Sequence, residues 1–229
     1  MTTRRPNWGA VALFFVVACL WSWAAARWGA LHFPVGDTTL RIDDSILVGF
    51  GPAAGAMAAL LVTRRRPDIV TFLGQSPRTA LLALLAPIIL VAAFGLAKPH
   101  LGPHVDGFTF ALTVVIYCIG EELGWRGWLH DELASLKTWQ VAVITAPLWY
   151  AWHWTFLADL YDSLQFAAGF AALVAVASFG LAQAVRRTRS VAVAVAWHAA
   201  AKMLFWPAQI ALMIAAIAYA TWAGGRRTR

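Results

Sequence analysis

The feature that most constrains this chain is a series of apolar runs that are each long enough to cross a lipid bilayer. A transmembrane helix needs about 20 mostly apolar residues. Eight candidates lie at residues 8–26, 45–63, 79–97, 108–124, 139–157, 164–185, 190–206 and 207–223. Because 61% of the residues are apolar and only 13% are charged, the chain lacks the polar residues that a water-facing surface needs. We therefore predict an all-α fold, a polytopic membrane bundle of about eight transmembrane helices that forms a single domain over residues 1–229.

Two of these assignments leave alternatives open. The first run follows Arg4 and Arg5 and ends at Ala24-Ala25-Ala26, as a cleaved signal peptide would. We expect a retained span instead, because the apolar run is long and seven further candidates follow. The last two runs are separated only by Trp206 and Pro207, so they form either a tight hairpin or one broken helix.

The basic residues are gathered in short clusters between the apolar runs, and the formal net charge is +7. The loops on the opposite side contain only Arg27, Arg41 and Lys98. Because cytoplasmic loops retain positive charge during insertion, we predict a multi-pass protein of the cell membrane with both termini in the cytoplasm. The clusters favour anionic lipids of the bilayer, and without a broad basic face they argue against nucleic-acid binding. The clusters are Arg4-Arg5, Arg64-Arg65-Arg66, Arg186-Arg187 and Arg226-Arg227.

Two further features are expected to be structural. Cys19 and Cys118 lie inside apolar runs, without the spacing of a disulfide framework or a zinc site, so we expect small buried side chains. Gly51 and Gly55 form a G-x-x-x-G pattern, which is typical of close helix packing in membranes.

Adjacent carboxylates end the fourth apolar run, although ionisable side chains are costly at membrane depth and usually functional there. Glu122 lies four residues before Arg126, so the two can pair on one helix face. Glu121 points about 100° away, and we expect it to be available as a general base toward water. The alternative is that both glutamates lie at the membrane interface and that Arg126 snorkels to the surface.

Two other spans also contain ionisable residues. The fifth contains His153, and the seventh contains His198 and Lys202 on one helix face. From the helix rise of about 1.5 Å per residue, we expect Glu121, His153 and His198 to converge on one cavity that opens to the cytoplasm. Tryptophans of one group should crowd around these side chains, namely Trp125, Trp128, Trp149, Trp152, Trp154 and Trp197. A second group lies at predicted span ends, where aromatic rings favour the interface: Trp8, Trp28, Trp139, Trp206 and Trp222.

The order of these residues resembles the pattern of the CPBP family of intramembrane proteases, the CAAX protease and bacteriocin-processing family, which includes the Ras-converting CAAX protease of eukaryotes. The family pattern is Glu-Glu-x-x-x-Arg, then aromatic-x-x-x-His, then His-x-x-x-(Asn or Asp), on successive helices. The resemblance covers residues 110–206, a motif-bearing core within the membrane domain. Two positions depart from the pattern: Trp149 stands where the family usually has Phe, and Lys202 stands where it has Asn or Asp.

The resemblance implies an endopeptidase that hydrolyses a peptide bond in a membrane protein or a lipid-anchored peptide, for example a lipidated CAAX-type tail. It implies that Glu121 and His153 activate water, that Glu122 and Arg126 support the site, and that His198 stabilises the oxyanion. Lys202 can donate to the oxyanion, snorkel, or lock Glu121 in an ion pair. No cofactor is required for this chemistry, although zinc stays possible because Glu121, His153 and His198 can chelate it if they converge.

Two other functions remain open at this point. A catalytically degenerate relative would act as a membrane scaffold, immunity factor or regulatory protein, and Lys202 favours that reading. A small transporter is the other, because intramembrane Glu and His also build proton relays. No matched pair of discontinuous helices supports a transporter. The sequence predicts neither an oligomeric state nor the identity of the substrate.

Overall fold

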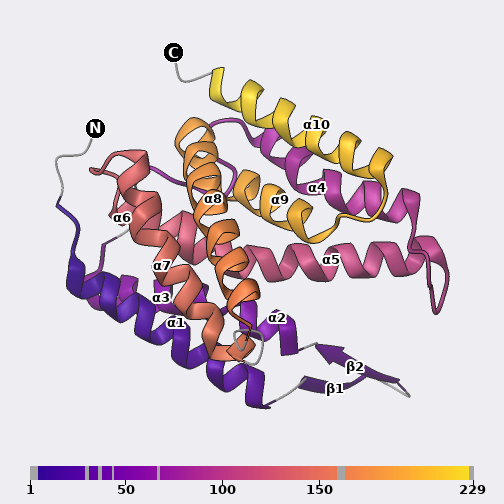
Figure 1. Cartoon of the computed structure of the whole chain (residues 1–229), viewed down its shortest axis with the longest axis horizontal. Helices are drawn as coiled ribbons and strands as arrows, with labels where there is room; N and C mark the ends of the chain where they lie inside the picture. Colours follow the sequence, from indigo (N-terminus) through magenta and orange to yellow (C-terminus); the bar gives the residue numbers. More distant parts are fainter. Residues whose placement is uncertain are drawn as a thin grey trace.

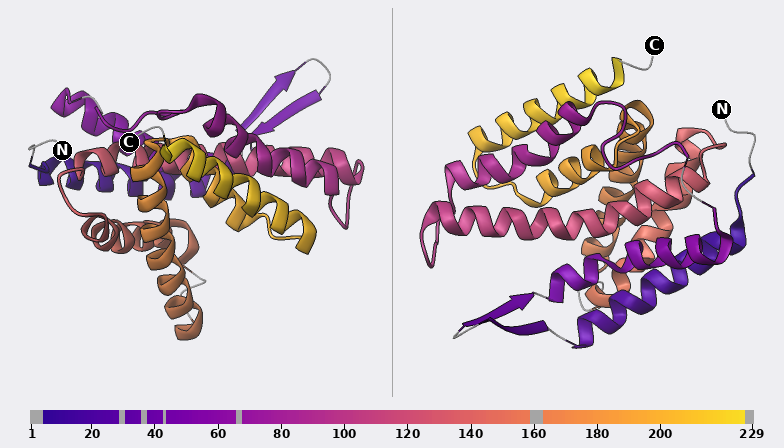
Figure 2. Two further views of the ribbon diagram at one scale, coloured as in Figure 1. Left: turned by 90° about the horizontal axis from the view of Figure 1, so that it is seen from above. Right: turned by 180° about the vertical axis from the view of Figure 1, so that it is seen from behind.

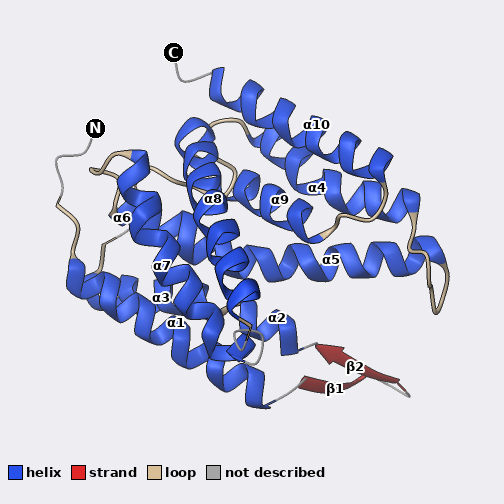
Figure 3. Cartoon of the chain, viewed as in Figure 1, coloured by secondary structure: helices blue, strands red, loops and turns tan. Residues whose placement is uncertain are grey.

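The computed structural model describes residues 5–28, 31–35, 38–42, 44–65, 68–158 and 163–226. They form a helical bundle with one small hairpin (Figures 1 and 3). The hairpin pairs strand β1 (Leu31–Val35) with β2 (Thr38–Ile42) in antiparallel register. The helices are α1 (Trp8–Trp28), α2 (Asp44–Gly49), α3 (Gly51–Thr63), α4 (Pro77–Phe94), α5 (Pro103–Glu122), η1 (Leu123–Leu129), α6 (His130–Glu132), α7 (Thr138–Leu157), α8 (Leu164–Thr188), α9 (Val191–Lys202) and α10 (Pro207–Gly225). The predicted helical fold is confirmed except for the hairpin, whose β-branched residues favour strand.

Every predicted apolar run is helical, and the second is divided into α2 and α3. Six helical stretches of the described chain are long and apolar enough to cross a membrane: α1, Ile46–Thr63, α4, Pro103–Glu132, α8 and α10. Helix α9 is apolar but has only 12 residues, about 18 Å at the usual helix rise. Helix α7 has 20 residues but contains Gln140, Thr145 and His153. Six candidate spans are thus confirmed, and the count of eight crossings stays a prediction. Helices α9 and α10 are separate, so the single broken helix is excluded.

Apolar side chains cover the outer faces of the bundle. Leu61, Leu164 and Val176 are each more than 70% exposed, which in a soluble protein would leave large apolar patches in contact with water. The five tryptophans predicted at span ends are all exposed at helix ends. These surfaces are suited to contact with lipid, so the protein is a membrane protein.

Both ends of the described chain lie at one end of the bundle, opposite the hairpin and the α4–α5 connection (Figures 1 and 2). The Asn7 backbone N–H donates to Glu132 Oε1 at 2.7 Å, and Thr71 and Ser190 form an isolated bridge at the same end. This arrangement agrees with an even number of crossings. That this end faces the cytoplasm stays a prediction, and Arg4, Arg66 and Arg227 of the basic clusters lie outside the described residues.

Helix α3 packs closely on α1 through the predicted glycines. A Cβ atom on Gly51 would lie 2.6 Å from the Ala18 carbonyl oxygen, and one on Gly55 would overlap the Phe14 carbonyl oxygen. The role predicted for this G-x-x-x-G pattern is therefore confirmed.

At the break between α2 and α3, α1 supplies side-chain donors to backbone carbonyls of α2. Trp21 Nε1 donates to the Leu47 carbonyl at 2.9 Å, and Ser22 Oγ donates to the Val48 carbonyl at 2.7 Å. A break inside a membrane bundle is stable only when such groups find partners within the protein. These hydrogen bonds hold the α2–α3 break in place against α1, and α5 packs on the other side of the break.

Candidate active site

The adjacent glutamates lie at the end of α5, between two glycines that pack on the α2–α3 break. A Cβ atom on Gly120 would lie 2.6 Å from the Gly49 carbonyl oxygen, and one on Gly124 would overlap Pro52. This close approach holds the segment in the centre of the bundle. Glu121 and Glu122 are accordingly both fully buried, at 0% exposure.

The helix continues after the glutamates as a π-helix, η1, and not as an α-helix. Single π-helical segments are rare and frequently occur at functional sites. Within η1, Arg126 Nη1 donates to Glu122 Oε1 at 3.1 Å, and Arg126 is only 2% exposed. The predicted pair is confirmed, and the alternative in which Arg126 snorkels to the interface is wrong.

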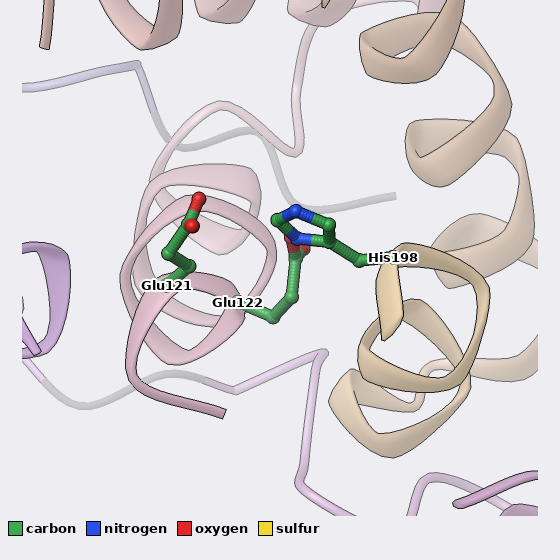
Figure 4. A group of neighbouring side chains, drawn as sticks. All are labelled: Glu121, Glu122 and His198. Atoms are coloured by element: carbon green, nitrogen blue, oxygen red, sulfur yellow. The ribbon is translucent and has the colours of Figure 1, made fainter. Parts of the chain in front are cut away.

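Glu122 also joins α5 to α9. Its Oε1 accepts a hydrogen bond from His198 Nδ1 at 2.8 Å (Figure 4). A ring nitrogen that faces a carboxylate carries hydrogen, and the His198 ring also interacts with the Cys118 side chain of α5. The sequence placed His198 near Glu121 but did not predict this bond to the neighbouring carboxylate.

The Glu121 carboxylate points to a different side from that of Glu122 (Figure 4). Its Oε2 accepts a hydrogen bond from Trp149 Nε1 at 2.8 Å. Its Oε1 is buried and has no partner at hydrogen-bond geometry among the described residues, and the Tyr117 hydroxyl interacts with the same carboxylate. One oxygen is thus fixed in orientation while the other is left for a ligand such as water.

Trp149 is the residue whose importance sequence reasoning missed. The Arg126 guanidinium lies 4.0 Å from the centre of its ring, a cation–π contact, and its indole N–H holds Glu121. It therefore contacts both members of the glutamate–arginine network. The available signal was the change from the family's usual Phe to Trp, because only Trp has a donor.

His153 lies one helical turn after Trp149 and is 6% exposed. Its Nδ1 lies 2.7 Å from the Trp149 carbonyl oxygen, to which it donates. The neutral ring therefore presents an unprotonated Nε2. His153, His198 and Lys202 are all close enough to Glu121 to interact with it electrostatically, so the predicted ionisable groups do gather around this carboxylate.

Lys202, the last residue of α9, lies on the face of Tyr117, with Nζ 4.3 Å from the ring centre. No described carboxylate lies within 4.0 Å of Nζ, so Lys202 does not lock Glu121 in a direct ion pair. Its side chain borders the same cavity as His153. Of the alternatives stated for Lys202, the direct ion pair is thus not formed among the described residues, and donation to the oxyanion and snorkelling stay predictions.

The site has two openings, not the single cytoplasmic cavity that we predicted. A cavity of about 480 Å³ contains His153 and Lys202 and is bordered by Ala26 and Leu157, near the hairpin end of the bundle. A groove of about 450 Å³ contains His198 and Trp149 and reaches Arg187, toward the end with the termini. The indole of Trp149 and the Glu121 carboxylate lie in the core between these openings. Only the His198 side therefore opens in the predicted direction.

The tryptophan prediction is correct for most of its six members. Trp125, Trp128, Trp149 and Trp152 are at most 4% exposed and lie in the core. Trp197 donates to Thr221 Oγ1 and borders the groove that contains His198 and Trp149. Trp154 is 58% exposed, so the prediction is wrong for this residue.

Glu121, Glu122 and His198 offer ligand atoms within 4.8 Å of one another and are the group among the described residues suited to hold a metal ion. Carboxylate and imidazole are ligand types that zinc accepts. A zinc ion there would polarise the substrate carbonyl. The predicted third ligand His153 is not in this group, and the Arg126 guanidinium already places positive charge beside Glu122.

The comparison with known families agrees with this geometry. Residues 103–204 match the family model described as Rce1-like, type II CAAX prenyl endopeptidase Rce1-like. No curated protein and no solved structure matches the chain. The matched segment contains α5, η1, α7, α8 and α9, the elements that hold every residue of the site. The match covers a little less than half of the chain and supports a relationship of this segment to the CAAX protease (CPBP) family.

Proposed function

We propose that this protein is an intramembrane endopeptidase that hydrolyses a peptide bond by glutamate-activated water. One observation supports the proposal above all: Glu121 is fully buried, with one oxygen held by Trp149 and the other without a partner among the described residues. A carboxylate oriented in this way suits general-base catalysis. The second carboxylate is occupied by Arg126 and His198, which gives the two glutamates different roles.

In the proposed reaction, Glu121 Oε1 takes a proton from water, and His153 Nε2 orients that water. The oxygen of the water attacks the peptide carbonyl and forms a tetrahedral intermediate. Glu121 then returns the proton to the leaving nitrogen as the C–N bond breaks. His198, which Glu122 holds at Nδ1, donates from Nε2 in its protonated form to the oxyanion.

The proposed substrate is a membrane protein or a lipid-anchored peptide. The site is buried among helices whose outer faces are apolar, and the two openings lie between those helices. A substrate held in the bilayer can reach such openings laterally, whereas a nucleic acid cannot. The reaction as proposed uses no metal ion, so a chelator is expected to leave cleavage unchanged.

The proposal is tested by comparing protein termini by mass spectrometry in membranes of three sets of host cells. One set lacks the gene, one expresses the wild type, and one expresses Glu121→Gln. We expect some protein termini to be lost in the cells that lack the gene, to reappear with the wild type, and to stay absent with Glu121→Gln. Ser178→Ala is the matched control, because Ser178 is 1% exposed and its hydroxyl has no described partner; it should restore the same termini.

A non-catalytic scaffold or regulatory protein is the second candidate, because Lys202 stands where the family pattern has Asn or Asp. In that case, wild type and Glu121→Gln would restore the same phenotype and no termini would depend on Glu121. Activity gained only in Lys202→Asn would identify a degenerate protease site.

A further inference from the structure

The cavity that contains His153 has mostly apolar walls and one lysine. Its described lining comes from α1, α2, α5, α7, α8 and α9 and includes no aspartate or glutamate. Val48, Phe156 and Phe170 are typical of its walls. At about 480 Å³, the cavity has the size and the mostly apolar character of ligand pockets, with few polar groups to fix orientation.

Lys202 is the last residue of α9, and its exposed side chain borders the cavity. Helix α9 begins at Val191, beside the end that contains the chain termini, and Lys202 is its twelfth and last residue. At the usual rise, Lys202 is therefore about 18 Å from the start of the helix. A lysine in a membrane helix usually pairs with a countercharge or with other acceptors.

The described chain supplies no such partner by direct contact. The ammonium lies on the Tyr117 ring at 4.3 Å, which satisfies part of its charge but none of its three N–H donors. Glu121 acts on it electrostatically, but Glu121 is fully buried and is not among the described cavity-lining residues. The donors of Lys202 are therefore directed to whatever occupies the cavity.

We propose that Lys202 binds a carboxylate of the substrate and selects peptides with an acidic group close to the bond that is hydrolysed. This inference rests on the proposed function and names the substrate class. The acidic group is either a Glu or Asp side chain or a free C-terminal carboxylate. Apolar walls strengthen a charge-assisted hydrogen bond of this kind.

The test uses four N-palmitoylated peptides of leucine and alanine. Each contains Glu or Gln at one position and ends in a free acid or an amide. Their affinities are measured on full-length Glu121→Gln protein in lipid nanodiscs, so that no peptide is consumed. We expect peptides with a carboxylate to bind about tenfold or more tightly than the Gln amide, the range of one charge-assisted hydrogen bond. The Glu amide and the Gln acid separate the two sources of the carboxylate.

Substitutions at Lys202 make the test specific. Lys202→Met on the same background should bring all four affinities together, and Lys202→Arg should retain the preference. Lys98→Met is the matched control, because Lys98 is exposed in the α4–α5 connection and does not line the cavity. Equal affinities on the starting protein, or a preference that persists in Lys202→Met, would overturn the inference.

Cleavage assays separate this inference from the proposed function. If the carboxylate preference depends on Lys202 but wild type and Glu121→Gln yield the same termini in cells, the protease proposal fails and the carboxylate site stands. If termini depend on Glu121 but the four peptides bind equally, the protease proposal stands and the carboxylate site is excluded.

Discussion

At the scale of single residues, Trp149 contacts three different residues of the site. Its indole N–H donates to Glu121, its ring supports Arg126, and its backbone carbonyl holds His153. The indole hydrogen bond leaves Glu121 Oε1 as the oxygen that can accept a proton. Trp149 is thus a positioning residue for the proposed base.

Trp149→Phe tests this role, because Phe keeps an aromatic face under Arg126 and removes only the donor. We expect kcat to fall about tenfold or more while KM changes little, since a hydrogen bond to a charged group contributes about 1.5–3 kcal/mol. Steady-state kinetics of the purified protein measure both constants. Trp139→Phe, at an exposed tryptophan, should behave as wild type. Full kcat in Trp149→Phe would show that the bond does not orient the base.

The buried pair of Glu122 and Arg126 gives a second prediction at this scale. Both side chains are at most 2% exposed, so removal of one partner leaves an uncompensated charge, which costs about 3–5 kcal/mol. Arg126→Met and Glu122→Gln should each lower the midpoint of thermal unfolding. The double variant should be more stable than either single variant, and strict additivity of the two losses would contradict a direct pair.

Spacing along the chain predicted some of these contacts and not others. The pair of Glu122 with Arg126 follows from their separation within one segment. The bond of His198 to Glu122 and the contact of Lys202 with Tyr117 join different helices. Such contacts depend on how each helix is rotated about its axis, which the periodicity of strongly apolar helices leaves undetermined.

At the scale of elements, the site depends on how η1 meets the α2–α3 break. The Gly51-Pro52 pair gave a sequence signal for a helix start at this break, but the predicted span 45–63 ran through it. The π-helix had no comparable signal, because Leu123–Leu129 contains residues that an α-helix also accepts. Its wider turn becomes visible only from the packing of Gly124 on Pro52.

Gly124→Ala tests this packing, because the added methyl group would overlap the Pro52 backbone. Overpacking of this kind costs about 1–3 kcal/mol, and movement of η1 would also displace Arg126. We expect a lower unfolding midpoint and a lower kcat. Gly169→Ala is the matched control, since a Cβ atom there meets nothing within 4 Å and alanine favours the helix. Equal behaviour of the two variants would show that the contact is not needed.

At the scale of the whole molecule, composition predicted a membrane bundle, and runs of apolar residues predicted the positions of the long helices. The direction of the larger cavity was not predicted, because it depends on which helices separate near the hairpin end. The hairpin lies between two predicted spans, and the search for long apolar runs gave no prediction for the residues between them.

The predicted orientation is tested with single cysteines in a variant that lacks Cys19 and Cys118. Asn7→Cys lies at the end with the termini, and Leu101→Cys lies in the α4–α5 connection at the other end. In intact cells, a membrane-impermeant maleimide should label Leu101→Cys and should label Asn7→Cys only after permeabilisation. The reverse pattern would invert the orientation, and labelling of both in intact cells would contradict a spanning bundle.

Hydrolysis of the peptide bond by water that Glu121 activates can be tested in one reconstituted reaction. Purified wild type and Glu121→Gln are placed in proteoliposomes with a substrate found in the comparison of termini, in water labelled with ¹⁸O. The account predicts that the wild type produces a new C-terminus that contains one ¹⁸O atom. It predicts no product from Glu121→Gln at an unchanged unfolding midpoint. Cleavage by Glu121→Gln at the wild-type rate would contradict the account.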